Sequence, residues 1–165
     1  MRIIGIDPGT YTTGYGIIDN EGGTTRVVAY GCITNKSKRS SERYLAIYSA
    51  LLDIIREYKP QHCSIESTFF LKNPKVVMRL GEVRGVLILA AVQEGLEVFE
   101  YPPLKVKQSV VGYGKADKNQ VGRMVKSILA LKELPKPDDV SDALALALCH
   151  VHNRKTIKLN LVKTI

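Results

Sequence analysis

The chain has 165 residues, 24 of them Lys or Arg and 16 Asp or Glu, which gives a formal net charge of +8. This length suits one compact domain and excludes a second domain of ordinary size. A composition of 45% hydrophobic and 24% charged residues excludes a disordered or fibrous protein, and the pI near 9.4 favours a polyanionic partner.

The first third of the chain predicts three antiparallel strands. Residues 2–7 are a nearly continuous apolar run, typical of a strand buried on both faces, and Pro8-Gly9 end it. A second strand is expected over 14–19 and a third, rich in Val and Thr, over 24–33. Between them Glu21-Gly22-Gly23 is typical of a hairpin turn.

Helices and two further strands follow. A helix capped by Ser40 or Ser41 is expected to end before Lys59-Pro60, and a second, capped by Asn73, to run to about Glu94. The other expected elements are strands over 62–66 and 97–101 and helices over 117–131 and 137–152. This order predicts a mixed five-stranded α/β sheet with helices on both faces. We expect residues 1–152 to form the domain and 153–165 a basic, frayed tail.

The sequence predicts a cytoplasmic protein without a membrane segment. Its longest apolar run, 86–92, is far shorter than the ~20 residues that span a bilayer, and no signal-peptide core is present. Cys32, Cys63 and Cys149 are expected to be buried free thiols in a reducing compartment. A zinc site would need the group His62, Cys63, Cys149, His150 and His152. Adjacent Cys-His pairs lack the usual ligand spacing, so this site is disfavoured.

Two carboxylates follow short buried strands. Asp7 ends the first strand and Glu66 the fourth, and a buried carboxylate is costly unless it is paired, hydrogen-bonded or on a metal. The ordinary alternatives are a turn aspartate bonding the amides of residues 9 and 10, and an exposed strand-end glutamate. If the two strands are parallel neighbours, however, the two carboxylates meet at one edge of the sheet.

Further acids begin the last helix. Asp139 and Asp142 are three residues apart and share a helical face, while Asp138 could also reach Asp142 at a spacing of four. Acids in a first turn are favoured by the helix dipole, which explains Asp138 and Asp139 without any function. Asp142 lies one turn inside an Ala- and Leu-rich helix, where a polar pocket is expected.

Together these residues would form a cluster of four carboxylates. Packed closely, they repel one another unless cations neutralise them, and hard oxygen ligands suit Mg²⁺ or Mn²⁺. Two such ions, roughly 3.5–4 Å apart, can activate water and stabilise a leaving oxygen in phosphodiester hydrolysis. The basic charge of the chain would supply the complementary attraction for a polyanionic substrate.

Basic residues concentrate in two stretches. One holds Lys105, Lys107, Lys115, Lys118, Arg123 and Lys126, and the other Lys72, Lys75, Arg79 and Arg84. Each stretch alone is compatible with a solvated helix face. The adjacent Phe69 and Phe70 are harder to bury together, and one of them could stack on bases or wedge between them.

The motifs together resemble the RuvC family of Holliday junction resolvases over about residues 1 to 152. The matching segments are Ile4-Gly5-Ile6-Asp7-Pro8-Gly9, Thr13-Gly14-Tyr15-Gly16, Ile65-Glu66, Gly85-Val86, Val98-Phe99-Glu100-Tyr101, 106–112 and 139–145.

This resemblance implies an RNase H-like fold and a homodimeric, Mg²⁺-dependent endonuclease that nicks four-way DNA junctions symmetrically. The positions that match the family's metal ligands are Asp7, Glu66, Asp139 and Asp142, so the resemblance favours Asp139 over Asp138. Phe69 matches an aromatic residue placed into the junction, and Lys107 and Lys118 match basic residues for catalysis or phosphate contact. The implied partners are RuvA and RuvB. Ser67-Thr68 departs from the family pattern, which leaves the local DNA contacts open.

Two other classes remain as alternatives. An actin-like ATP-binding module also begins with an Asp-x-Gly turn and a hairpin, but it needs a second such domain. A non-catalytic junction-binding protein of the same fold is the other, and the four intact carboxylates argue against it.

Overall fold

The computed structural model describes residues 1–67 and 73–157 of the chain. The strands are β1 (Arg2–Asp7), β2 (Thr12–Glu21), β3 (Thr24–Thr34), β4 (His62–Glu66) and β5 (Glu97–Tyr101). The helices are α1 (Ser40–Tyr58), α2 (Pro74–Gln93), α3 (Pro103–Val111), α4 (Lys118–Ile128) and α5 (Asp138–Ile157). The strands form one sheet in the order β3-β2-β1-β4-β5.

The sheet is mixed, as the sequence predicts. β1 pairs antiparallel with β2 and parallel with β4, and the last pair of the parallel ladder is Ile6 opposite Ile65. β2 pairs antiparallel with β3, and β4 pairs parallel with β5. The carboxyl ends of β1 and β4 therefore lie side by side, which was the condition for Asp7 and Glu66 to meet.

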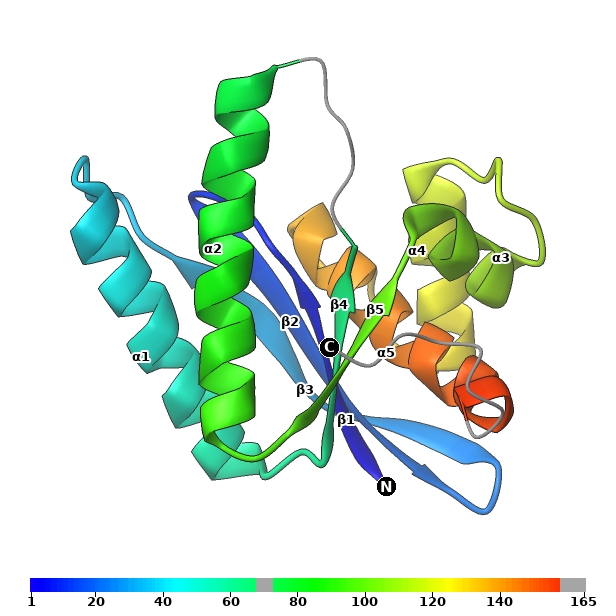
Figure 1. Ribbon diagram of the computed structural model, residues 1–165. Coiled ribbons are helices and arrows are strands. Elements are labelled where there is room, and N and C mark those ends of the chain that lie inside the picture. The colour runs from blue at the N-terminus through cyan, green and yellow to red at the C-terminus, as the bar shows by residue number, and fades with distance from the viewer. Residues whose placement is uncertain (68–72, 158–165) are drawn as a thin grey trace.

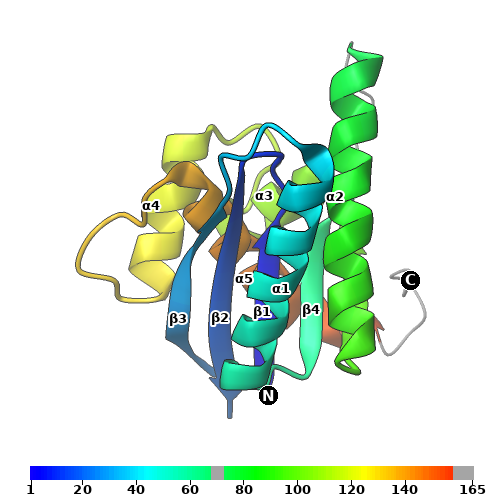
Figure 2. The same ribbon diagram turned by 90° about the vertical axis from the view of Figure 1, so that its left-hand side faces the viewer.

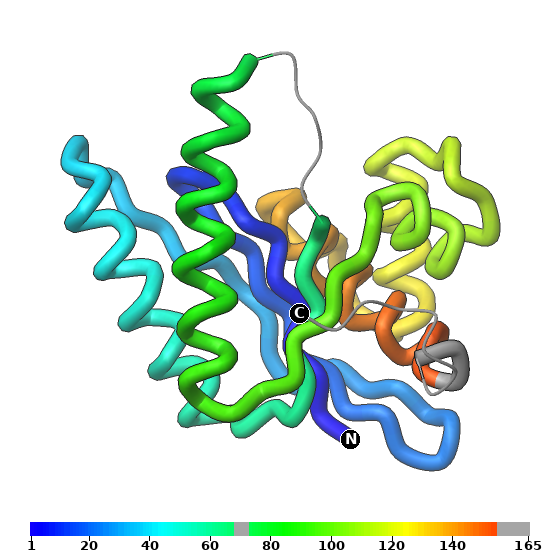
Figure 3. The backbone as a smooth tube through the Cα atoms, viewed as in Figure 1, coloured from blue at the N-terminus to red at the C-terminus, as the bar shows by residue number. Residues whose placement is uncertain are grey.

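Helices cover both faces of the sheet. α1 and α2 lie on one face, and α3, α4 and α5 lie on the other (Figures 1 and 2). Alternate residues of β1 point to opposite faces. Ile3 belongs to the core under α5, whereas Ile4 and Ile6 belong to the core under α1 and α2. The tube in Figure 3 shows β1 running through the middle of the molecule, from its start beside the N-terminus to its end on the opposite side of the structure.

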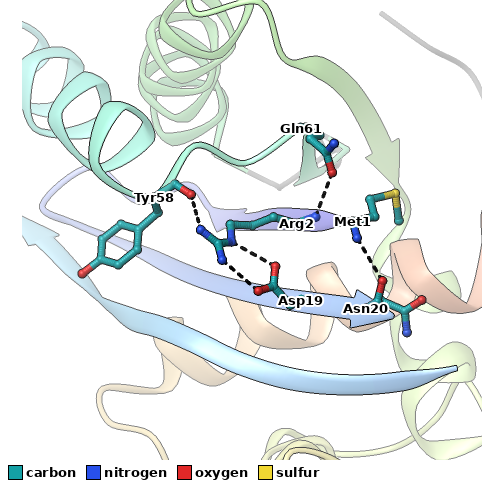
Figure 4. Close-up of polar contacts among 6 residues, drawn as sticks. All are labelled: Met1, Arg2, Asp19, Asn20, Tyr58 and Gln61. Atoms are coloured by element: carbon teal, nitrogen blue, oxygen red, sulfur yellow. Dashed lines mark hydrogen bonds and ion pairs between the residues drawn. The ribbon is translucent and has the colours of Figure 1, made fainter. Parts of the chain in front are cut away.

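Polar contacts hold the first residue of β1 (Figure 4). The Arg2 guanidinium donates from Nε and Nη2 to the Asp19 carboxylate on β2, at 2.9 and 2.8 Å, and from Nη1 to the carbonyl oxygen of Tyr58 at 2.6 Å. The Arg2 amide donates to Gln61 Oε1 at 3.0 Å. The start of β1 is thus joined to β2, to the end of α1 and to the segment before β4, at the opposite end of the strand from Asp7.

Glycines let α5 lie directly on β1 and β2. A Cβ added at Gly5 would stand 2.0 Å from the carbonyl oxygen of Ala143, and one at Gly14 would stand 2.0 Å from that of Asp139. These glycines therefore set how closely the acidic start of α5 approaches Asp7.

Two expectations about the helices were wrong. α3 is absent from the expected elements, because Pro102-Pro103 directly follows the strand over 97–101 and is equally typical of a strand end. In fact Pro103 begins the helix, and Gly112 ends it in the left-handed conformation. The last helix does not end at His152 but continues to Ile157, and the Asn153 amide, 6% exposed, donates to Ser109 Oγ at 2.8 Å. The division at residue 152 stays a prediction.

Smaller differences concern a cap and a thiol. α1 begins at Ser40, so Arg39 takes the cap position and neither Ser40 nor Ser41 does. Cys63 and Cys149 are buried free thiols, but Cys32 is exposed because β3 is an edge strand. Among the described residues, no helix is long and apolar enough to cross a membrane.

Candidate active site

A cavity of about 250 Å³ opens where β1 and β4 end. Its polar lining consists of Asp7, Glu66, Lys107, Lys118 and Asp142, and its apolar lining of Pro103, Val106, Val121, Ala145 and Leu146. Five separate elements thus bring three of the four predicted carboxylates and both predicted lysines to one place. No pattern in the sequence indicated the apolar wall, because it is assembled from three helices, α3, α4 and α5, and α3 was not expected.

Asp7 points into this cavity from the end of β1. The turn after it is closed by Thr13, whose hydroxyl donates to the carbonyl oxygen of Gly9 at 3.2 Å and accepts from the Gly9 amide at 3.5 Å. Among the described residues, none donates a hydrogen bond to the Asp7 carboxylate. The alternative of a turn aspartate that caps this loop is therefore not supported.

Glu66 reaches the cavity from the last residue of β4. The strand is fixed to α5 by Ser64, whose hydroxyl donates to the carbonyl oxygen of Leu146 at 2.8 Å. The Arg84 side chain donates from Nε to the main-chain oxygen of Glu66 at 3.1 Å. Arg84 was expected to belong to a basic surface stretch, but its side chain is only 16% exposed. No local pattern in the sequence indicated this burial, because it depends on how α2 packs on the sheet.

Asp142 faces the cavity from α5 and accepts a hydrogen bond from Lys118 Nζ at 3.0 Å. Lys118 is the first residue of α4, whose start is fixed by a capping box between Asp117 and Gln120. The contact with Asp142 raises the pKa of the Lys118 ammonium above its ordinary value. The ammonium therefore stays charged and stands where a cation would be attracted.

Asp138 and Asp139 have different surroundings. The charge of Asp139 raises the pKa of Asp7, so Asp139 lies close to the carboxylate group although it does not line the cavity. Asp138 instead lines a neighbouring cavity together with Lys118 and Lys136. This arrangement favours Asp139 as the fourth ligand, and its role stays a prediction.

The carboxylates are poorly compensated in the absence of a metal. The pKa of Asp7 is raised from 3.8 to about 8, mainly by burial and also by the charges of Asp142, Glu66 and Asp139, against the opposing effect of Lys118. Burial and Asp142 raise the pKa of Glu66 from 4.5 to about 7, against Lys118 and Lys107. The site therefore favours protons or other cations at neutral pH.

The donor chemistry fits a hard divalent cation. All the acidic groups offer oxygen ligands, and their mutual repulsion would be relieved by bound positive charge. Within the described ranges, no three His, Cys, Asp or Glu side chains already stand at metal-binding spacing. Binding would therefore draw the carboxylates together and weaken the contact between Lys118 and Asp142.

The disfavoured zinc site does not form. His62 and His150 are hydrogen-bonded, with Nδ1 and Nε2 2.8 Å apart, and His150 Nδ1 is bonded to the Tyr101 hydroxyl. Cys63 lies in the core under α1 and α2, whereas Cys149 lies in the core under α5. The predicted DNA-contacting residue Phe69, like its neighbour Phe70, lies outside the described residues.

Comparison with known proteins gives consistent matches. The family model "Crossover junction endodeoxyribonuclease RuvC" matches residues 3–150. The protein of that name from Caldicellulosiruptor saccharolyticus is 50% identical over 159 residues, covering 95% of this chain and 96% of the relative. The one from Pelotomaculum thermopropionicum is 51% identical over 154 residues, covering 93% and 94%.

Solved structures agree with these matches. T. thermophilus RuvC in complex with Holliday junction substrate has a TM-score of 0.91 and 30% sequence identity, covering 100% of this chain and 99% of that one. The yeast mitochondrial Holliday junction resolvase Ydc2, at 13% identity and a TM-score of 0.68, shares the fold. The predicted RNase H-like architecture is thereby confirmed.

Proposed function

The chain belongs to the RuvC family of crossover junction endodeoxyribonucleases, and we propose that it resolves four-way DNA junctions by paired, symmetric nicks. As a member of this family it is a divalent-metal-dependent nuclease that acts in recombination. The finer assignment is that Mg²⁺ is the metal, two ions per site with Mn²⁺ as a substitute. Its ligands would be Asp7, Glu66, Asp139 and Asp142.

One observation carries this proposal: carboxylates and lysines from distant parts of the chain line a single cavity. Acidic groups alone would repel a phosphodiester, and lysines alone would bind it without cutting it. When bound, the metal ions would supply the Lewis acidity that phosphodiester hydrolysis requires. Lys107 and Lys118 would hold the scissile phosphate against the carboxylates, and the apolar wall would limit the access of bulk water.

The test is a nicking assay on a synthetic four-way junction with Mg²⁺. We expect two nicks in strands of like polarity, no comparable cutting of linear duplex, and complete loss of cutting in EDTA. Binding without any nick would instead identify a non-catalytic junction-binding protein. Tight ATP binding would revive the actin-like alternative.

Paired nicks need two active sites, and the exposed side of α2 supports a homodimer. Residues three or four apart form an apolar stripe, which we name the α2 stripe: Met78, Gly81, Gly85, Leu89 and Val92. Its large members Met78, Leu89 and Val92 are 67%, 58% and 53% exposed. The glycines would let a second copy of the helix approach closely. α2 also extends beyond the end of the sheet (Figure 2), where it is open to a partner.

Leu89→Glu is expected to convert the protein from a dimer to a monomer of 18.3 kDa. Dimer formation would bury the new carboxylate between the two α2 stripes without a partner, which is costly. Light scattering coupled to size exclusion measures the mass. Leu45→Glu is the control, since Leu45 is 66% exposed on α1 and lies outside the stripe. Equal masses for the two variants would refute α2 as the contact.

Other parts of the proposal concern partners and location. We propose that the enzyme acts with the RuvA–RuvB branch-migration complex in the cytoplasm, and that Phe69 enters the junction. Residues 153–165, the first of which belong to α5, are proposed as a basic segment that contacts a partner through its Lys and Arg residues. Support comes from the net charge of +8 and the family membership.

A further inference from the structure

Arg84 connects α2 to the catalytic edge of the sheet. Its Nε donates to the main-chain oxygen of Glu66 at 3.1 Å, and its Nη2 pairs with the carboxylate of Glu100 on β5. Both side chains are largely buried, at 16% and 26% exposed. One guanidinium therefore contacts the ends of two adjacent strands.

These contacts occur where Glu66 is still paired with Tyr101 on β5 but no longer with β1. The ladder between β1 and β4 ends at Ile65, one residue earlier. Beyond it, the Ser67 amide donates to the carbonyl oxygen of Tyr101 at 3.0 Å, and Arg84 binds the carbonyl oxygen of Glu66. The Glu66 peptide is thus held from the α2 face while its carboxylate lines the cavity under α5. A rotation of this peptide would move the carboxylate.

A role in stability alone explains this pair poorly. Burying an ion pair costs desolvation that its attraction often fails to recover, and an apolar pair of similar volume is frequently as stable. The Nε–H bond instead fixes the orientation of one main-chain carbonyl group, which a methionine could not do.

We propose that Arg84 is a positioning residue for the active site. It orients Glu66 toward Asp7 and Asp142, and Glu100 holds Arg84 in place. This inference rests on the proposed role of Glu66 as a metal ligand. Arg84 touches neither the substrate nor the metal, and acts only through the main chain of Glu66.

The experiment compares Arg84→Met/Glu100→Gln with wild type. The double variant leaves no unpaired buried charge. Arg56→Met is the matched control, because Arg56 of α1 pairs at 2.8 Å with Glu94, just after α2, at a distance from the cavity. Mn²⁺ alone is titrated calorimetrically into the free protein, and junction binding in EDTA and thermal melting are measured alongside.

We expect the double variant to bind Mn²⁺ about 10-fold more weakly. This is the lower end of the loss in metal affinity that follows when a residue that orients a metal ligand is removed. Its junction binding in EDTA and its melting temperature should match those of Arg56→Met. Arg84→Lys keeps the charge but lacks the Nε–H, so it should show the same weaker metal binding.

The proposal is overturned if the double variant binds Mn²⁺ as tightly as Arg56→Met does. It is also overturned if the double variant melts more than about 10 °C below Arg56→Met, equivalent to ~3 kcal/mol, because the pair would then serve stability. Failure of the proposed function is a separate result, because wild type would then leave the junction uncut whatever the behaviour of Arg84.

Discussion

Asp7→Asn is expected to abolish junction cleavage and to leave junction binding in EDTA unchanged. Asp7 is the central carboxylate, since Asp142, Glu66 and Asp139 all act on its pKa. An amide offers a neutral oxygen and cannot balance the charge of the ions. The loss in rate should exceed about 100-fold, because removing a residue that only orients a metal ligand already costs up to that much and Asp7 is proposed as a ligand itself.

The same substitution should stabilise the metal-free protein at neutral and alkaline pH. Folding raises the pKa of Asp7 from 3.8 to about 8, so the folded state holds a proton that the unfolded state has released. Its contribution to stability is complete below about pH 4 and is lost as the pH rises to about 8. The asparagine side chain has no proton to lose, so the melting temperature of Asp7→Asn should exceed that of wild type increasingly over this range.

Melting curves in EDTA at pH 4.5 and pH 8 test this expectation, together with the nicking assay. At pH 8 the variant should melt at least about 3 °C higher, equivalent to ~1 kcal/mol for a domain of this size. Asp53→Asn on the exposed side of α1 is the control and should change neither cleavage nor the pH profile. Substantial cleavage by Asp7→Asn would exclude Asp7 as an essential ligand.

Gly5→Ala is expected to cost about 3 kcal/mol of unfolding free energy, the upper end for an overpacked core. The added Cβ would meet the carbonyl oxygen of Ala143 at 2.0 Å and the amide nitrogen of Ala147 at 2.8 Å. Both atoms belong to the main chain of α5, so the helix itself must move. Because α5 carries Asp142, cleavage should also fall in the molecules that remain folded.

Urea unfolding measures this loss, and Gly122→Ala provides the control. Gly122 is also buried, on α4, but its added Cβ would have neighbours no closer than 3.7 Å. The helical setting should make that substitution neutral or stabilising by up to ~1 kcal/mol. Equal stability of the two variants would contradict the close approach of α5 to β1.

The sequence predicted the strands well because each carries its own local signal. The apolar run before Asp7 indicates a central strand, and Glu21-Gly22-Gly23 indicates the hairpin. Asn73 and Pro74 located the start of α2 because both residues act on their own backbone. Helix α3 was missed because Pro102-Pro103 looks the same whether it ends a strand or begins a helix.

By itself, the sequence determined the order of the elements and the carboxylates that could form a site. It also determined the family, since several motifs in register are specific in a way that no single residue is. Only the tertiary structure decided that Asp7, Glu66 and Asp142 share one cavity, because that depends on the parallel pairing of β1 with β4 and on the glycine surface under α5. The contacts of Arg84 with Glu100 and with the main chain of Glu66 are also visible only in the tertiary structure. Contacts between residues distant in the chain depend on packing, which no local pattern contains.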